Sequence, residues 1–160
     1  MAELDRPLGL SRGAVIVKPY DVRWQNAYAK VEQRLETILE PLSPRIEHIG
    51  STAVPGLAAK PVLDVAIGLS SRSNLDAAVR RLVENGYEWR EDAGDAGGVI
   101  VVDGPESART HYLHLVPTDD PQWQRYLSFR DALRRDRVLR DRYAALKVEL
   151  AERFPANRAA

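Results

Sequence analysis

The run VLDVAIGL at residues 62–69 constrains the fold of this chain more than any other segment. It is short, almost wholly apolar and bounded by turn residues, which is typical of a central strand covered on both faces. A strand of that kind needs other elements packed against each side, so it predicts a layered domain. Its one charged residue, Asp64, is costly to bury as a carboxylate unless a cation or hydrogen-bond donors lie beside it.

The patterns around that strand predict an α/β or α+β domain, with helices packed on a sheet. Period-two or β-branched runs predict strands at 14–18, 45–49, 62–69, 87–90, 98–103 and 111–116. Apolar residues at helical spacing predict helices at 24–39 and 75–85, and a helical tail from residue 121 onward. Residues 1–13 are polar and are predicted to be a flexible arm, which leaves residues 14–155 as a single domain.

Composition excludes several classes of protein. The chain has no cysteine, so it has neither disulfides nor thiolate metal sites. No apolar run is long enough to cross a bilayer and no signal-peptide pattern is visible, so we expect a cytoplasmic protein without a membrane partner. The net charge is 0, but residues 122–160 carry 10 Lys and Arg against 5 Asp and Glu. We expect no DNA or RNA partner; the basic tail presents either a local surface for a phosphorylated ligand or a solvated helix face.

The chemistry of the chain is concentrated in residues 46–67, IEHIGSTAVPGLAAKPVLDVAI. Gly50 lets the backbone approach an anion closely, and Ser51 and Thr52 add hydroxyl and N–H donors. Lys60 either neutralises a phosphate or pairs with a surface acid. Asp64 either holds a divalent metal ion or accepts backbone N–H groups of the adjacent loop.

Further candidates lie on the flanking elements. Glu47 and His48 alternate along a strand, so only one of them faces the Asp64 side, and parity alone does not choose between them. His114 is a candidate metal ligand or base, with the neighbouring His111 as a weaker one, although a lone histidine on an apolar face is more often part of the core. Arg130 and Arg134 are four residues apart and share a helix face, with Lys147 further along the tail. They either bind phosphate or form solvated ion pairs.

The segment resembles the active-site signature of the DNA polymerase β-like nucleotidyltransferase superfamily, in which a Gly-Ser turn is followed by an acidic residue on the next strand. In more detail, the chain is similar to the GrpB family. The block HIGSTAVPGLAAKPVLDV carries most of the resemblance, and PYDVRW, HYLHLV, FRDALRRD and YAALKVEL follow the family order around it. The resemblance implies a nucleotidyltransferase-type fold, a mixed sheet flanked by helices with a helical C-terminal segment.

The resemblance also implies a site. In active members of the superfamily the Gly-Ser turn holds a nucleotide triphosphate, two carboxylates on one strand bind Mg²⁺, and a third carboxylate helps activate the attacking hydroxyl. This chain departs from that plan, because Ala66 stands where the second carboxylate is expected. The expected metal, Mg²⁺ or Mn²⁺, would then have Asp64, His48 and His114 as ligands, and the catalytic set would be Asp64, His114 and Glu47. The expected phosphate contacts are Gly50, Ser51, Thr52, Lys60, Arg130, Arg134 and Lys147.

Two functions stay open at this point. One is a nucleotidyltransferase that binds a nucleotide or other phosphorylated small molecule and transfers a nucleotidyl group to a small acceptor. The alternative is a non-catalytic domain that has lost the metal carboxylates and binds a nucleotide or a coenzyme A-like ligand; members of the family also occur fused to dephospho-coenzyme A kinase. A weaker third hypothesis is a protein-interaction module that uses the basic tail.

Overall fold

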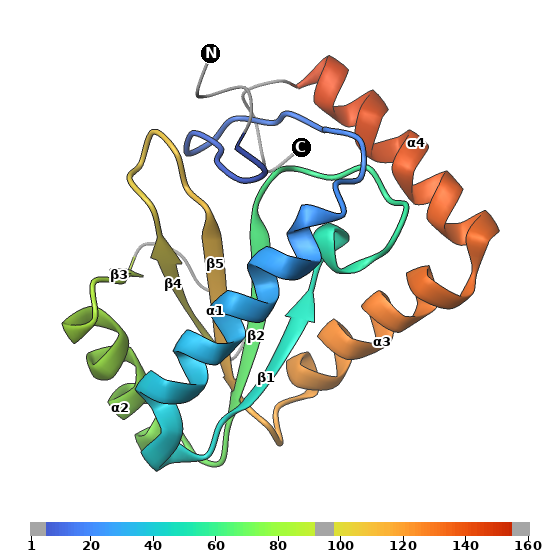
Figure 1. Ribbon diagram of the computed structural model, residues 1–160. Helices are drawn as coiled ribbons and strands as arrows, with labels where there is room; N and C mark the ends of the chain where they lie inside the picture. The colour runs from blue at the N-terminus through green and yellow to red at the C-terminus, as the bar shows by residue number, and fades with distance from the viewer. Residues whose placement is uncertain (1–5, 92–97, 155–160) are drawn as a thin grey trace.

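The computed structural model describes residues 6–91 and 98–154 of the chain (Figure 1). The strands are β1 Arg45–Ile49, β2 Leu63–Leu69, β3 Glu88–Arg90, β4 Val99–Asp103 and β5 His111–Pro117. The helices are α1 Arg23–Leu39, α2 Arg72–Glu84, α3 Pro121–Arg135 and α4 Arg137–Arg153, with 3-10 turns η1 Glu40–Leu42 and η2 Ser51–Ala53. The first five residues of the predicted arm, residues 92–97 and residue 155, which ends the predicted domain, lie outside the described residues. In the part of the chain that the structure describes, no helix is both long and apolar enough to cross a membrane.

The strands form one five-stranded sheet in the order β1-β2-β5-β4-β3. β2 and β5 are parallel, and the other neighbouring pairs are antiparallel, which confirms the predicted mixed sheet flanked by helices. The register places Asp64 between Ile49 of β1 and Tyr112 of β5. Ala66 lies between Glu47 and His114 in the same way. Because directly paired residues face the same side, these side chains share one face of the sheet.

The two faces of the sheet are covered by different helices. α1 and α2 pack on one face (Figure 1), where Leu35 and Leu75 meet Val65 and Ile67 in the main apolar core. α3 packs on the opposite face, where Trp123 contacts Ala66 and other buried residues of β1 and β5. The predicted central position of the apolar strand is confirmed, since β2 has a neighbour on each side and is covered on both faces.

Short polar side chains mark where helices begin. Ser71 accepts a hydrogen bond from the Asn74 N–H at the start of α2, and Asp120 accepts one from the Gln122 N–H at the start of α3. Asp136 has an extended backbone conformation and accepts a hydrogen bond from the Leu139 N–H. It therefore ends α3 and caps α4, so the helical tail turns at this residue.

That turn brings α4 against the loop that follows β1. Tyr143 and Ala144 of α4 pack against a small buried cluster made by Val54, Leu57 and Leu133. α4 has no fully buried residue of its own. It lies along the outside of the molecule next to the loop that follows the η2 turn (Figure 1).

The predicted strand at 14–18 is wrong. The segment forms no strand: Lys18 makes an isolated β-bridge with Ala59, and the Ile16 side chain is half exposed. Leu10 is buried, and its N–H and C=O exchange hydrogen bonds with Arg109. The N–H of Gly9 donates to the Pro61 carbonyl. Residues 6–13, which the sequence assigns to a flexible arm, thus lie along the end of the sheet.

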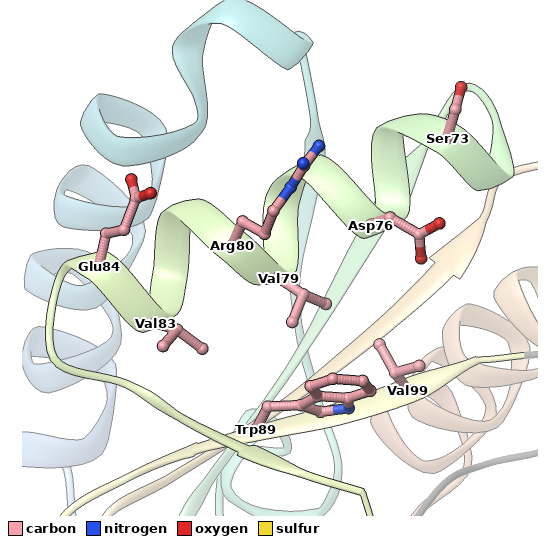
Figure 2. A pocket seen from close by; sticks show the side chains of 8 residues that line it. All are labelled: Ser73, Asp76, Val79, Arg80, Val83, Glu84, Trp89 and Val99. Carbon is pink, nitrogen blue, oxygen red and sulfur yellow. The ribbon is translucent and has the colours of Figure 1, made fainter.

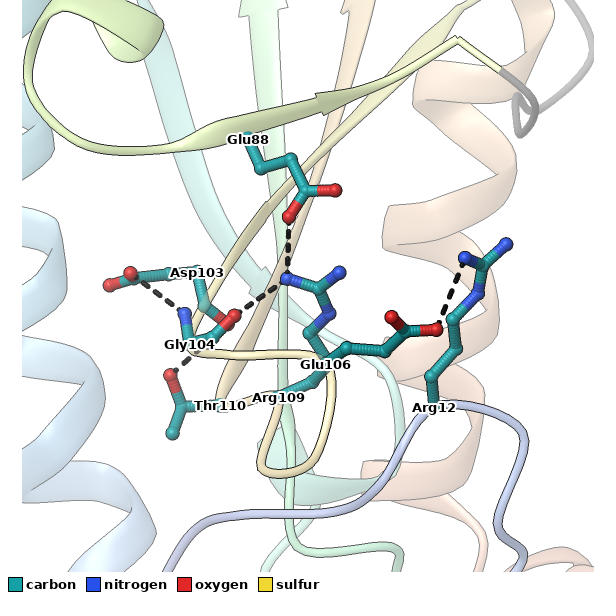
Figure 3. Close-up of polar contacts among 7 residues, drawn as sticks. All are labelled: Arg12, Glu88, Asp103, Gly104, Glu106, Arg109 and Thr110. Carbon is teal, nitrogen blue, oxygen red and sulfur yellow. Dashed lines mark hydrogen bonds and ion pairs between the residues drawn. The ribbon is translucent and has the colours of Figure 1, made fainter.

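Arg109 holds this end of the sheet together (Figure 3). Its side chain is only 3% exposed and forms an ion pair of 2.9 Å with Glu88 of β3. The same guanidinium nitrogen donates to the Gly104 carbonyl at 2.6 Å. One buried side chain therefore ties the β4–β5 turn to the edge strand β3.

Candidate ligand-binding site

The turn after β1 lies directly against Asp64. Gly50 has φ 72° and ψ −174°, a backbone conformation that is essentially restricted to glycine. A Cβ atom at Gly50 would lie 2.7 Å from Asp64 Oδ2. Glycine is thus required twice at this position, once for the backbone angles and once for the space that the carboxylate fills. The structure brings the Gly50–Ser51 turn and Asp64 together on one side of the sheet.

A cavity of about 260 Å³ opens beside this contact; we call it the Gly50 cavity. It is lined by Gly50, Ser51, Thr52, Lys60, Asp64 and Lys147, together with Tyr143. Lys147 lies over the Tyr143 ring, 5.1 Å from its centroid, so α4 supplies a positive charge to the cavity. The hydrogen bonds of the η2 turn are donated by Ala53 and Val54, which leaves the N–H groups of Ser51 and Thr52 outside that pattern.

A second cavity of about 390 Å³ adjoins the first, and Gly50 and Asp64 line both; we call it the His114 cavity. Its other walls include His114, Gln122, Arg125, Tyr126 and Phe129. His114 Nε2 lies 3.0 Å from Asp64 Oδ1. An ionised carboxylate can only accept, so Nε2 of His114 is the donor in this contact. The His114 ring is therefore held in place by the Asp64 carboxylate.

His48 is on the opposite face of the sheet from Asp64 and His114. Ile49 is the residue that pairs with Asp64, and strand alternation turns the preceding side chain away. His48 Nε2 is 2.9 Å from Thr52 Oγ1, and its ring stacks on Tyr28 with centroids 4.4 Å apart. Burial lowers the pKa of His48 to about 4, so the ring is neutral at neutral pH. The predicted metal set of Asp64, His48 and His114 is not assembled.

Glu47, Arg130 and Arg134 line a third cavity of about 360 Å³ at the free edge of β1, which we call the β1-edge cavity. Arg130 Nη1 donates to Glu47 Oε2 at 2.7 Å and to the His48 carbonyl at 3.1 Å. Arg134 Nε donates to the Ala53 carbonyl at 2.9 Å. The structure therefore places Glu47 and both arginines outside the Gly50 cavity, where the sequence predicted a common site with Lys60 and Lys147.

The residues present do not fit the divalent metal that the sequence resemblance implies. Magnesium prefers an octahedral set of oxygen ligands, and Ala66 leaves Asp64 as the single carboxylate on its strand. Among residues 6–91 and 98–154, no group of three or more His, Cys, Asp or Glu could hold a metal ion. Nor does His111 contribute, since its Nδ1 lies 2.7 Å from Thr110 Oγ1 and 3.4 Å from Asp103 Oδ2.

Sequence reasoning missed several lining residues. Tyr143 is four residues before Lys147 on one helix face, a spacing that could have identified it. Tyr126 and Phe129 carry no such signal, because aromatic residues at helical spacing usually belong to a core. A hollow of about 670 Å³ between α2 and the β3–β4 edge also went unpredicted. In Figure 2 its valines point toward Trp89, and Arg80 and Glu84 extend away from this apolar patch, so no reactive groups converge there.

A mixed sheet in which a Gly-Ser turn faces an aspartate on the next strand defines a nucleotidyltransferase-type fold. Solved structures of this type are similar to the chain. A Cid1 poly(U) polymerase structure with bound Mg 3′-dATP has a TM-score of 0.58 and 15% identity, over 86% of this chain and 44% of that chain. At that identity the likeness shows the fold alone.

The chain belongs to the GrpB family, whose model, described as "GrpB protein", matches residues 14–160. The crystal structure of conserved protein GrpB from Enterococcus faecalis has a TM-score of 0.80 and 33% identity, over 90% of this chain and 87% of that one. The glutamate-rich protein GrpB of Alkalihalophilus pseudofirmus is 32% identical over 92% of this chain and 87% of its own length.

Other relatives are longer than the region they share with this chain. UPF0157 protein YqkA of Bacillus subtilis is 33% identical over 85% of this chain, which spans 39% of that protein. The dephospho-CoA kinase of Mycolicibacterium paratuberculosis is 35% identical over 81 residues, which are 49% of this chain and 20% of that protein.

Proposed function

We propose that this protein binds a phosphorylated small molecule, such as a nucleotide, with its phosphate in the Gly50 cavity. The observation that carries the proposal is the convergence of Lys60 and Lys147 on a cavity with one carboxylate, that of Asp64. Two ammonium groups against one carboxylate give the cavity an excess positive charge, which favours an anion. Hydroxyl and N–H donors of Ser51 and Thr52 are of the kind that binds phosphate oxygens.

The size of the two adjoining cavities supports a ligand larger than phosphate. The Gly50 cavity, at about 260 Å³, suits a phosphate group, and the His114 cavity adds about 390 Å³ on the other side of Asp64. Pockets for small ligands commonly measure about 300–1,000 Å³. Tyr126 and Phe129 would supply apolar contact for a nucleoside. The nucleotide ligands named for Cid1 structures, and the partial match to a dephospho-CoA kinase, support a nucleotide or coenzyme A-like molecule.

A second candidate function is transfer of a nucleotidyl group to a small acceptor. The pair formed by Asp64 and His114 favours it, because Asp64 holds in place an imidazole, the side chain that most often serves as a general base. Glu47 has no part in this candidate, because Arg130 binds its carboxylate. Since the donor set does not fit Mg²⁺ or Mn²⁺, the proposal assigns no step to a metal ion.

The proposed partner is a small molecule, and the absence of a DNA or RNA partner stays a prediction. Two of the basic residues of α4 are paired along the helix, Arg137 with Asp141 at 3.9 Å and Arg153 with Glu149 at 3.6 Å. Such pairs reduce the positive field that a phosphate backbone needs. A cytoplasmic location also stays a prediction.

The proposal is tested by measuring thermal stability and heats of binding with ATP, coenzyme A and inorganic phosphate, each with and without Mg²⁺ or Mn²⁺. A ligand that binds only the folded state raises the melting temperature. Lys60→Met and Lys147→Met should each weaken binding by about tenfold or more, the loss expected when a charge-assisted hydrogen bond is removed. Lys30→Met, at an exposed position of α1, is the matched control and should change nothing.

Asp64→Asn tests whether a metal ion takes part in binding. If the ligand binds as a free anion, removal of the carboxylate charge relieves repulsion and should tighten binding. If binding requires a metal ion held by Asp64, the same substitution should weaken it and abolish the effect of Mg²⁺ or Mn²⁺. The proposal is refuted if no ligand binds at millimolar concentration, or if Lys30→Met weakens binding as much as the two cavity variants.

A further inference from the structure

The β1-edge cavity is a polar hollow that the proposed function does not use. Its walls come from three elements that meet at the free edge of the sheet. α1 contributes Gln25, Tyr28 and Glu32, which recur on one helix face, and α3 contributes Arg130 and Arg134, which are four residues apart. The edge strand β1 contributes Glu47 and His48. At about 360 Å³ the cavity is large enough for a small molecule.

Part of the charge in this cavity is already compensated. The Arg130 side chain is only 10% exposed and is paired with Glu47 at 2.7 Å and with Asp131 at 3.0 Å. His48 contributes no charge at neutral pH, because burial lowers its pKa to about 4. These residues form the fixed wall of the cavity, because each side chain is held by hydrogen bonds or by the ring stack on Tyr28.

Arg134 and Glu32 are different, because neither forms an ion pair with any residue in 6–91 or 98–154. Arg134 uses Nε to donate to the Ala53 carbonyl, so its two terminal nitrogens are not engaged by that bond. Glu32 accepts a hydrogen bond from Tyr28. The cavity therefore has a cation from α3 and an anion from α1 that are not joined in an ion pair among the described residues.

Both charges are also disfavoured by their surroundings. Partial burial lowers the pKa of Arg134 and nearby Arg130 lowers it further, which outweighs the opposite effect of Asp131 and Glu47. Burial raises the pKa of Glu32, with Glu36 as the next contribution. A bound group of opposite charge would offset each of these shifts. Both side chains line the same cavity, so a ligand that fills it would contact both charges.

We propose that the β1-edge cavity binds a small zwitterion with a carboxylate and an ammonium group, such as an amino acid, with its carboxylate at Arg134 and its ammonium at Glu32. The guanidinium fork matches a carboxylate in two parallel hydrogen bonds. Arg134 is exposed, so a ligand can enter from solvent. The inference does not rest on the proposed phosphate site, since a different cavity and different side chains carry it.

The test uses a series of ω-amino acids of increasing length, from glycine through 3-aminopropanoate and 4-aminobutanoate to 6-aminohexanoate. Butanoate and butylamine serve as matched ligands that carry one charge each. At least one amino acid of the series should raise the melting temperature and give a measurable heat of binding, whereas butanoate and butylamine at the same concentration should bind more weakly. The ring signals of His48 in an NMR spectrum should shift on binding, because this ring lines the cavity.

Arg134→Gln and Glu32→Gln should each weaken binding of that amino acid by about tenfold or more. Arg135→Gln on α3 and Glu40→Gln after α1 are matched controls at exposed positions and should leave binding unchanged. Since neither tested side chain has an ion pair in the described residues, both variants should fold, which circular dichroism would verify. The proposal is overturned if no amino acid binds at 10 mM, a concentration on the order of a hundredfold above the dissociation constant of a moderate small-molecule ligand. It is also overturned if butanoate binds as well as the amino acids, or if Lys147→Met weakens binding and Arg134→Gln does not.

Discussion

Substitution of Gly50 by alanine tests the contact on which the candidate site depends. The residue has φ 72° and ψ −174°, and its backbone lies against the Asp64 carboxylate. An added methyl group would meet Asp64 Oδ2 at 2.7 Å and Asp64 Cβ at 3.0 Å. Alanine must therefore either strain the turn or displace the carboxylate that faces the cavity.

Two contributions set the size of the effect. A residue with a Cβ in this backbone region costs about 1–3 kcal/mol. Overpacking against the fixed strand residue adds about 1–3 kcal/mol. We expect Gly50→Ala to lower the free energy of unfolding by about 4 kcal/mol, the middle of the combined range, and the melting temperature by roughly 10 °C for a domain of this size.

The chain offers two controls that separate these contributions. Gly56 also has a positive φ, of 80°, but a Cβ there would meet nothing within 4 Å. Gly56→Ala should therefore cost only the backbone part, about 1–2 kcal/mol. Gly68 has no positive φ, but its Cβ would meet Thr118 at 2.7 Å and Trp123 at 3.0 Å, so Gly68→Ala reports the packing part alone.

Urea denaturation followed by circular dichroism gives the three free energies of unfolding. The same three proteins are then titrated with the ligand that binds the Gly50 cavity. Gly50→Ala should lose that binding because Asp64 moves, whereas Gly56→Ala should retain it. If Gly50→Ala is no less stable than Gly56→Ala, the close approach to Asp64 does not constrain the turn, and the reasoning about the site is refuted.

Two further predictions concern the edge of β1. Burial lowers the pKa of His48 to about 4 from an ordinary value near 6.5, so as the pH falls the unfolded chain takes up this proton before the folded protein does. The free energy of unfolding should therefore drop by roughly 3 kcal/mol between pH 6.5 and 4. Urea denaturation at several pH values measures this drop, which should be smaller in His48→Gln. A flat profile would contradict the buried, neutral state. Arg130→Gln should cost about 1–3 kcal/mol, since its side chain is 10% exposed and bonds Glu47. Arg137→Gln should cost less than about 0.5 kcal/mol, because its ion pair is exposed; equal losses in the two variants would contradict this difference.

The sequence predicted most of the fold because most of its elements have local periodic signals. The apolar run of β2 and the helical spacing in α1 do not depend on distant residues. The segment 14–18 has an equally good β-branched pattern, but a strand also needs a neighbour to pair with. Its only described ladder contact is the bridge between Lys18 and Ala59, so tertiary placement overrode the local preference.

The site was harder to predict, because it depends on strand register. Strand alternation shows that Glu47 and His48 face opposite sides of the sheet, but not which of them shares the face of Asp64. The pairing of Ile49 with Asp64 shows that it is Glu47. The spacing of Arg130 and Arg134 correctly placed them on one helix face. It did not show that α3 would carry them to the β1 edge, since that depends on how α3 packs on the sheet.

The η2 turn is a common wall of the Gly50 and β1-edge cavities, so we expect the two proposed ligands to be energetically dependent on one another. Thr52 lines the Gly50 cavity, yet its hydroxyl bonds His48 in the β1-edge cavity. The Ala53 carbonyl accepts from Arg134, so the same three-residue turn is held from the second side. We therefore expect a ligand that shifts this turn from one cavity to change the geometry of the other. Linkage then requires the effect to be reciprocal: whatever factor an amino acid imposes on phosphate binding, phosphate imposes on amino acid binding. A turn that needs glycine at its start, and is bonded from both sides, has little freedom to absorb such a shift without transmitting it.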